Sequence, residues 1–203
     1  GRSALMLSGG GVFGFLHLGV VTELLRHGLL PRVISGSSAG SVVAAALAAY
    51  TDEEMASLDL IGLMESGGAD TRGLIRQWLS GAGSRFTADD VEKLIEATIP
   101  DLTFGEAYAK TGRQVSITVA PAEPHQRSRL LNAVSSPNVF LRSAAMASCA
   151  IPGVFPAVML KAKNERGEAQ PYLPARRWVD GSVADDLPAK RLSRLFSTNH
   201  YIV

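Results

Sequence analysis

"VISGSSAGSVVAAALAAY", residues 33–50, joins a short apolar run to a long run of small residues through two serines between two glycines. The apolar run predicts a buried strand, and residues 39–50, almost free of polar side chains, predict a helix buried on all sides. Residues 36–40 match Gly-x-Ser-x-Gly with Ser38 at the centre, which between a strand and a helix is the context of a nucleophilic serine. A tight turn of small packing residues gives the same pattern, so the nucleophile hypothesis needs a base near Ser38.

A second glycine cluster, residues 9–14 (GGGVFG), follows an apolar strand pattern at residues 4–7 and precedes a helical pattern that ends at Gly28. One interpretation is a dinucleotide fingerprint, which requires an acidic residue at the end of the second strand. That strand ends Ile-Ser-Gly at residues 34–36, which weakens this interpretation. The alternatives are a plain glycine turn and an oxyanion hole, in which unobstructed N–H groups of Gly9, Gly10 and Gly11 face one point.

Strands and helices that alternate in this way predict an α/β fold with a mostly parallel sheet. The rest of the chain continues the alternation, and no linker is visible, so we predict a single domain over residues 1–203. We also expect that this domain is excised from a longer chain. The further predicted elements are a capping box at residues 87–90 opening a helix, strands at 114–120 and 129–133 that pair, a helix at 139–149, a surface loop at 163–170 and strands at 178–179 and 200–203.

Two residues compete as the base for Ser38. Asp180 ends a strand and precedes Gly181, and the carboxyl ends of strands are where open α/β sheets place their ligand chemistry. His200 completes the order Ser, Asp, His of an α/β-hydrolase triad, but it opens an apolar strand instead of lying on a loop. The other candidates have structural interpretations: His17 in the core, His27 at a helix end, His125 in a polar turn, and Asp185 and Asp186 as turn or cap residues.

Composition excludes several classes of function. The chain carries 20 basic and 19 acidic residues, a net charge of +1, so no strong field attracts nucleic acid. One cysteine permits no internal disulfide and no cysteine-based metal site, and no apolar run of 18 residues predicts a membrane span. We therefore expect a cytoplasmic protein with no nucleic-acid partner.

Several longer stretches resemble the patatin-like phospholipase family: GGGVFGFLHLGVV, ISGSSAGSVVAA, CAIPGVFPAVML and WVDGSVADDLPAKRL. They are similar to the subgroup of storage-lipid triacylglycerol lipases and its bacterial relatives. The resemblance implies a three-layer α/β/α fold and a Ser–Asp dyad, with Ser38 as nucleophile, Asp180 as base and Gly9, Gly10 and Gly11 as the oxyanion-hole segment. It also implies a lipid substrate with a fatty-acyl ester, no cofactor or metal, and peripheral contact with a membrane or lipid droplet.

One position departs from the family pattern. The acidic motif of the family is usually Asp-Gly-Gly or Asp-Gly-Ala, and here Ser182 is third, where we expect it to add a hydrogen bond to Asp180. Two expectations concern substrate access: an acyl channel lined by apolar side chains of residues 154–160, and a lid formed by the glycine-rich residues 67–84. The alternatives left open are a Ser–Asp–His esterase using His200 and a catalytically silent lipid-binding domain.

Overall fold

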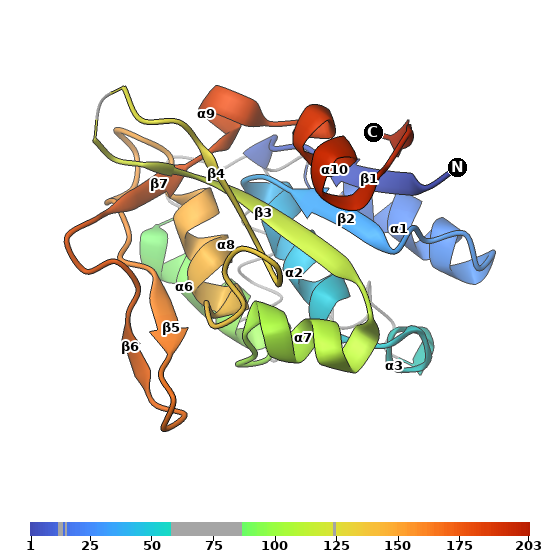
Figure 1. Cartoon of the computed structure of the whole chain (residues 1–203), viewed down its shortest axis with the longest axis horizontal. Coiled ribbons are helices and arrows are strands. Elements are labelled where there is room, and N and C mark those ends of the chain that lie inside the picture. Colours follow the sequence, from blue (N-terminus) through green and yellow to red (C-terminus); the bar gives the residue numbers. More distant parts are fainter. Residues whose placement is uncertain (12–13, 15, 58–86, 124) are drawn as a thin grey trace.

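The computed structural model describes residues 1–11, 14, 16–57, 87–123 and 125–203 (Figure 1). Six described strands form the central sheet in the order β4-β3-β2-β1-β8, with β7 paired to β3. β1, β2, β3 and β8 are parallel, and β4 and β7 are antiparallel to β3. The strand bounds are β1 Ser3–Leu7, β2 Val33–Gly36, β3 Gln114–Pro121, β4 Arg129–Asn132, β7 Trp178–Asp180 and β8 His200–Ile202.

Helices cover both faces of this sheet. Their bounds are α1 Leu16–Arg26, α2 Ala39–Ala49, α3 Asp52–Ser57, α6 Ala88–Thr98, α7 Phe104–Thr111, α8 Leu141–Cys149, α9 Ser182–Asp185 and α10 Ala189–Phe196. A separate hairpin pairs β5 Lys161–Lys163 with β6 Ala169–Pro171 at the polar segment that the sequence marks as a surface loop.

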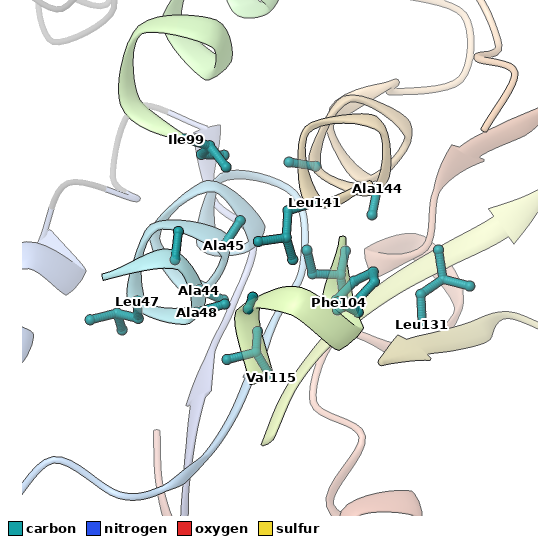
Figure 2. Packing of buried hydrophobic residues seen from close by; sticks show 14 of the residues in the cluster. Ala44, Ala45, Leu47, Ala48, Ile99, Phe104, Val115, Leu131, Leu141 and Ala144 are labelled. Atoms are coloured by element: carbon teal, nitrogen blue, oxygen red, sulfur yellow. The ribbon is translucent and has the colours of Figure 1, made fainter. Parts of the chain in front are cut away.

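The two faces of the sheet belong to two apolar clusters, because side chains alternate along each strand. Leu5 and Leu7 of β1 pack on the side of α2 and α8, whereas Ala4 and Met6 pack on the side of α10. Helix α2 lies at the centre of the larger cluster, where its alanines face α8 and β3 (Figure 2). This arrangement confirms the predicted three-layer fold with a mostly parallel sheet.

Two glycines allow the tight passage from β2 into α2. A Cβ on Gly40 would collide with the carbonyl oxygen of Leu7, and one on Gly36 would collide with the carbonyl of Gly40. The start of α2 therefore lies directly against the carboxyl end of β1. Both glycines of the Gly-x-Ser-x-Gly motif are therefore required, because another part of the backbone lies too close to leave room for a side chain.

The position of β7 follows from the pairing of Val119 on β3. Val119 pairs with Arg129 of β4 and with Asp180 of β7, so β4 and β7 occupy opposite edges of β3. Since β2 occupies the edge opposite β4, β7 takes up the β2 edge of β3 beyond the point where β2 ends. This antiparallel insertion was not predicted from the sequence.

Most predicted elements are confirmed within a few residues, including the capping box of Thr87 and Asp90 and the pairing of β3 with β4. Five elements were missed: the helices α7, α9 and α10 and the short strands β5 and β6. The predicted lid, residues 67–84, lies outside the described residues.

Candidate active site

Ser38 occupies a strained turn between β2 and α2. Its backbone has φ 48° and ψ −124°, a conformation that costs a residue with a Cβ roughly 1–3 kcal/mol and persists only when neighbours hold it. Its N–H donates to Ser148 Oγ at 2.9 Å, and its carbonyl accepts from the Ser41 hydroxyl at 2.6 Å. The Ser38 hydroxyl forms no hydrogen bond with a described residue, so it is uncommitted in this structure.

Asp180 is buried at the end of β7, with 3% of its surface exposed. Its N–H donates to the carbonyl of Ala150 at 2.9 Å, and its Oδ1 accepts from the N–H of Ser182 at 2.8 Å. The backbone of Ser182 therefore supplies the hydrogen bond that was expected from its hydroxyl. Any residue at position 182 can supply a backbone N–H, which gives a physical reason why the departure from the family pattern is tolerated.

Strand pairing shows how far along the sheet Asp180 lies relative to the turn at Ser38. The last residue of β2, Gly36, pairs with Ile117, and Asp180 pairs with Val119 on the same edge of β3. Two residues of a strand span roughly 7 Å, so Asp180 lies just beyond the end of β2, where the chain turns through Ser38.

Gly9 lies where three segments meet. A Cβ built on Gly9 would be 3.2 Å from the Cβ of Ser38 and 3.4 Å from the Cβ and Oγ of Ser182. The glycine loop, the turn at Ser38 and the segment after β7 therefore converge around one point. A side chain at position 9 would crowd the Ser38 side chain.

Asp186 connects the glycine loop to the turn at Ser38 through two hydrogen bonds. Its Oδ1 accepts from the N–H of Gly9 at 2.8 Å, and its carbonyl accepts from the Ser37 hydroxyl at 3.0 Å. The Gly9 N–H is thus already engaged, which leaves the N–H groups of Gly10 and Gly11 as the donors of the predicted oxyanion segment. Asp186 is the C-cap residue of α9, in agreement with its interpretation as a turn or cap residue. Nothing in its local sequence signals the further contact of its side chain with a residue 177 positions away.

The histidines lie elsewhere. His200 pairs with Ser3 at the amino end of β1, and Leu7, which pairs with Gly36, is roughly 13 Å further along that strand. His200 is also exposed, with Nδ1 3.1 Å from the Ser3 hydroxyl, so it is at the wrong end of the sheet to be the base for Ser38. His17 is half-buried against the carbonyl of Ser8 at 2.9 Å, and His27 lies beside Glu23 at the end of α1.

Cys149 lies between the two candidate catalytic residues. Its thiol donates to the carbonyl of Ser38 at 3.4 Å. Burial, and secondly the negative charge of Asp180, raise the pKa of this thiol to about 12. The thiol is therefore neutral at physiological pH and is not a competing nucleophile.

Two cavities lie between α6, α8 and the β5–β6 hairpin, and they share Met146 and Val158 in their walls. The smaller, about 30 Å³, is almost wholly apolar and reaches Cys149 and Ala150. The larger is about 260 Å³ and has charged residues at its rim. Of the residues expected to line an acyl channel, Phe155, Val158 and Met159 line these cavities, whereas Leu160 is in the core and Val154 is exposed.

The described residues include neither a candidate membrane span nor a candidate metal cluster. No helix in this part of the chain is long and apolar enough to span a bilayer. Within the same residues, no cluster of three histidine, cysteine, aspartate or glutamate side chains is arranged to hold a metal ion.

Comparison with known proteins places this geometry in a family. Residues 5–192 match the family model described as Patatin-like phospholipase. The chain is 43% identical to triacylglycerol lipase 4 and 37% identical to triacylglycerol lipase 5 of Saccharomyces cerevisiae, with the whole chain aligned in both cases. It spans 24% and 29% of these two relatives, so it corresponds to about a quarter of their length.

A solved structure shares the fold at lower identity. VipD from Legionella pneumophila aligns over 92% of this chain and 47% of its own, with a TM-score of 0.51 and 18% identity. At that identity the likeness concerns the fold alone.

Proposed function

Because the chain belongs to the patatin-like phospholipase family, we propose that it hydrolyses fatty-acyl esters of acylglycerols or phospholipids with Ser38 as nucleophile and Asp180 as base. The observation that carries this proposal is the pairing of β7 with β3, which brings a buried carboxylate to the level of the strained turn at Ser38. The names of the two yeast relatives support a triacylglycerol as the substrate, and the description of the family supports a phospholipid.

In the proposed reaction, Asp180 takes the proton of the Ser38 hydroxyl as Oγ forms a bond to the acyl carbon. The N–H groups of the glycine loop stabilise the oxyanion, and each such donor contributes on the order of 3 kcal/mol to the transition state. The ester C–O bond then breaks, and Asp180 returns the proton to the departing alcohol. A water molecule, deprotonated by Asp180, then attacks the acyl carbon. The bond from this carbon to Ser38 Oγ breaks, Asp180 returns the proton to Ser38 Oγ, and the fatty acid leaves. No step requires a metal or cofactor.

In this proposal a carboxylate acts as base without an imidazole, because His200 lies at the other end of the sheet and His17 contacts the Ser8 carbonyl. The surroundings of Asp180 fix its position through the Ala150 carbonyl and the Ser182 N–H, which is the orienting role that a third residue plays in a triad. The apolar cavity beside Cys149 and Ala150, which Met146 and Val158 also line, offers space for the start of an acyl chain.

Exposed apolar side chains on segments flanking the site support contact with a lipid surface. Val154 is 67% exposed and Val183 is 78% exposed, and they follow α8 and Asp180 closely in the chain. Ile151 and Leu187 extend this set. Apolar side chains on the segments that carry the site favour a partner that is itself apolar, as a membrane or lipid droplet is.

The test is product analysis on a mixed panel of triacylglycerols and phospholipids. We expect the wild type to release fatty acid, Ser38→Ala and Asp180→Asn to lose release by several orders of magnitude, and His200→Ala to retain it. Absence of release by the wild type from every ester, with lipid still bound, would favour the silent lipid-binding domain. Loss of activity in His200→Ala with the fold intact would contradict the dyad.

A further inference from the structure

The N–H of the proposed nucleophile is held by a side chain from a distant helix. Ser38 N–H donates to Ser148 Oγ at 2.9 Å, although the two residues are 110 positions apart in the chain. Ser148 lies in the last turn of α8 and has no exposed surface. A buried hydroxyl that accepts from a strained backbone N–H compensates for the hydrogen bond that this N–H cannot make within a helix or strand.

The same hydroxyl also contacts β3, the strand that pairs with β7, which carries Asp180. Ser148 Oγ donates to the carbonyl of Thr118 at 2.8 Å, and the next residue of β3, Val119, pairs with Asp180. One buried oxygen is thus hydrogen-bonded to the backbone of Ser38 on one side and to the backbone beside Asp180 on the other.

The next residues of the same segment extend this connection. The thiol of Cys149 donates to the carbonyl of Ser38 at 3.4 Å, and the carbonyl of Ala150 accepts from the N–H of Asp180 at 2.9 Å. Three consecutive residues at the end of α8 therefore contact the backbone on both sides of the site. Of their side chains, only that of Ser148 bridges the two sides.

We infer that Ser148 is a positioning residue. Its one hydroxyl holds the Ser38 backbone and the β3 backbone next to the pair of Val119 and Asp180, and so sets the separation of the Ser38 hydroxyl and the Asp180 carboxylate. The inference rests on the proposed roles of Ser38 and Asp180. Ser148 does not touch the reacting atoms, so its loss lowers kcat by misplacing the nucleophile and leaves the binding of substrate, and hence KM, nearly unchanged.

The experiment compares Ser148→Ala with Ser143→Ala on a water-soluble short-chain ester. Ser143 is a matched control, because its buried hydroxyl on the same helix also accepts from a backbone N–H, that of Lys161 at 2.7 Å. We expect Ser148→Ala to lower kcat roughly 10- to 100-fold, the range for a displaced catalytic group, and Ser143→Ala to stay close to the wild type. Thermal unfolding of both variants reports any general loss of stability.

Two further measurements keep the inference testable if Ser148→Ala folds poorly. Ser148→Thr retains the hydroxyl and Ser148→Val has the same shape without it, so the activity ratio of these two variants isolates the hydrogen bond. Hydrogen exchange of the Ser38 amide, which requires no turnover, should be faster in Ser148→Ala and unchanged in Ser143→Ala.

The outcomes separate this inference from the proposed function. An inactive wild type contradicts the proposed function, and the amide-exchange comparison still decides whether Ser148 holds the Ser38 backbone. An active wild type with equal kcat in Ser148→Ala and Ser143→Ala, or with equal activity in Ser148→Thr and Ser148→Val, overturns the inference.

Discussion

Cys149 can report on Asp180, because the negative charge of that carboxylate is one of the two causes that raise the pKa of the thiol. The chain has a single cysteine, so its titration can be assigned without ambiguity. The Cys149 thiol also donates to the Ser38 carbonyl, which makes it a probe inside the proposed site.

We predict that Asp180→Asn lets the Cys149 thiolate form at lower pH than in the wild type, where the pKa is about 12. The ultraviolet absorbance of the thiolate, with Cys149→Ala as the blank, measures this titration. An identical titration in both proteins would show that the charge of Asp180 does not reach Cys149.

The same pKa has a consequence for stability. The folded thiol holds its proton more tightly than an ordinary thiol with a pKa of 9.0. Its contribution to the free energy of unfolding is therefore complete below pH 9.0 and is lost as the pH rises toward 12. Cys149→Ala should remove this part of the alkaline loss of stability.

At the scale of residues, the sequence marks the candidate catalytic residues, but it does not mark the residues whose hydrogen bonds hold them in place. A turn motif marks Ser38 as a candidate and a strand end marks Asp180, which are local patterns, and the resemblance to the family implies their roles. The supporting contacts of Asp186 and Ser148 are not predictable in this way, because each links a side chain to a backbone N–H more than 100 residues away. A lone serine in a small-residue helix carries no local signal of such a contact.

At the scale of elements, hydrogen bonds from side chains hold α2 at both ends. Its first turn is bonded through Ser41 to the Ser38 carbonyl. At its other end, the buried guanidinium of Arg113 donates to the carbonyls of Leu47 at 2.6 Å and Tyr50 at 2.5 Å and pairs with Asp52. Burial lowers the pKa of Arg113, and the charge of Asp52 opposes this effect.

We predict that Arg113→Met reduces the free energy of unfolding by about 1–3 kcal/mol, because it leaves buried carbonyls at the end of α2 without donors. Chemical denaturation measures the change. The control is Arg32→Met, since Arg32 is exposed and donates to a carbonyl at 3.3 Å, and it should change stability by less than about 0.5 kcal/mol. Equal effects of the two substitutions would contradict the capping role.

Elements with a strong local sequence pattern were predictable. Elements that depend on the strands or helices they pair with were not. The alternation of Val115, Ile117 and Val119 marks β3, and the alanine-rich run marks α2. β7 has three residues, and its pairing with β3 depends on the early end of β2, which no local pattern encodes. Helix α7 was missed although Thr103 and Glu106 form a capping box at its start.

At the scale of the whole molecule, exposed valines of similar exposure lie at opposite ends of the sheet. Val154 follows α8, whose end contacts the site, and it is 67% exposed. Val134 is 63% exposed and follows β4, whose last residue, Asn132, pairs with Ser116 toward the amino end of β3.

We predict that Val154→Asp lowers hydrolysis of phospholipid vesicles roughly ten-fold, because a charge replaces an apolar contact with lipid worth about 1.5 kcal/mol or more. Hydrolysis of a water-soluble short-chain ester should be unchanged, and Val134→Asp should affect neither substrate. Equal vesicle activity in the two variants would place the lipid contact on another part of the surface.

The most direct test of the Ser–Asp account is covalent trapping with a long-chain alkyl fluorophosphonate, followed by mass mapping of the modified peptide. The account predicts one adduct on Ser38, none in Ser38→Ala, much slower labelling in Asp180→Asn and normal labelling in His200→Ala. An adduct on a different residue, or labelling of Asp180→Asn at the wild-type rate, would contradict it.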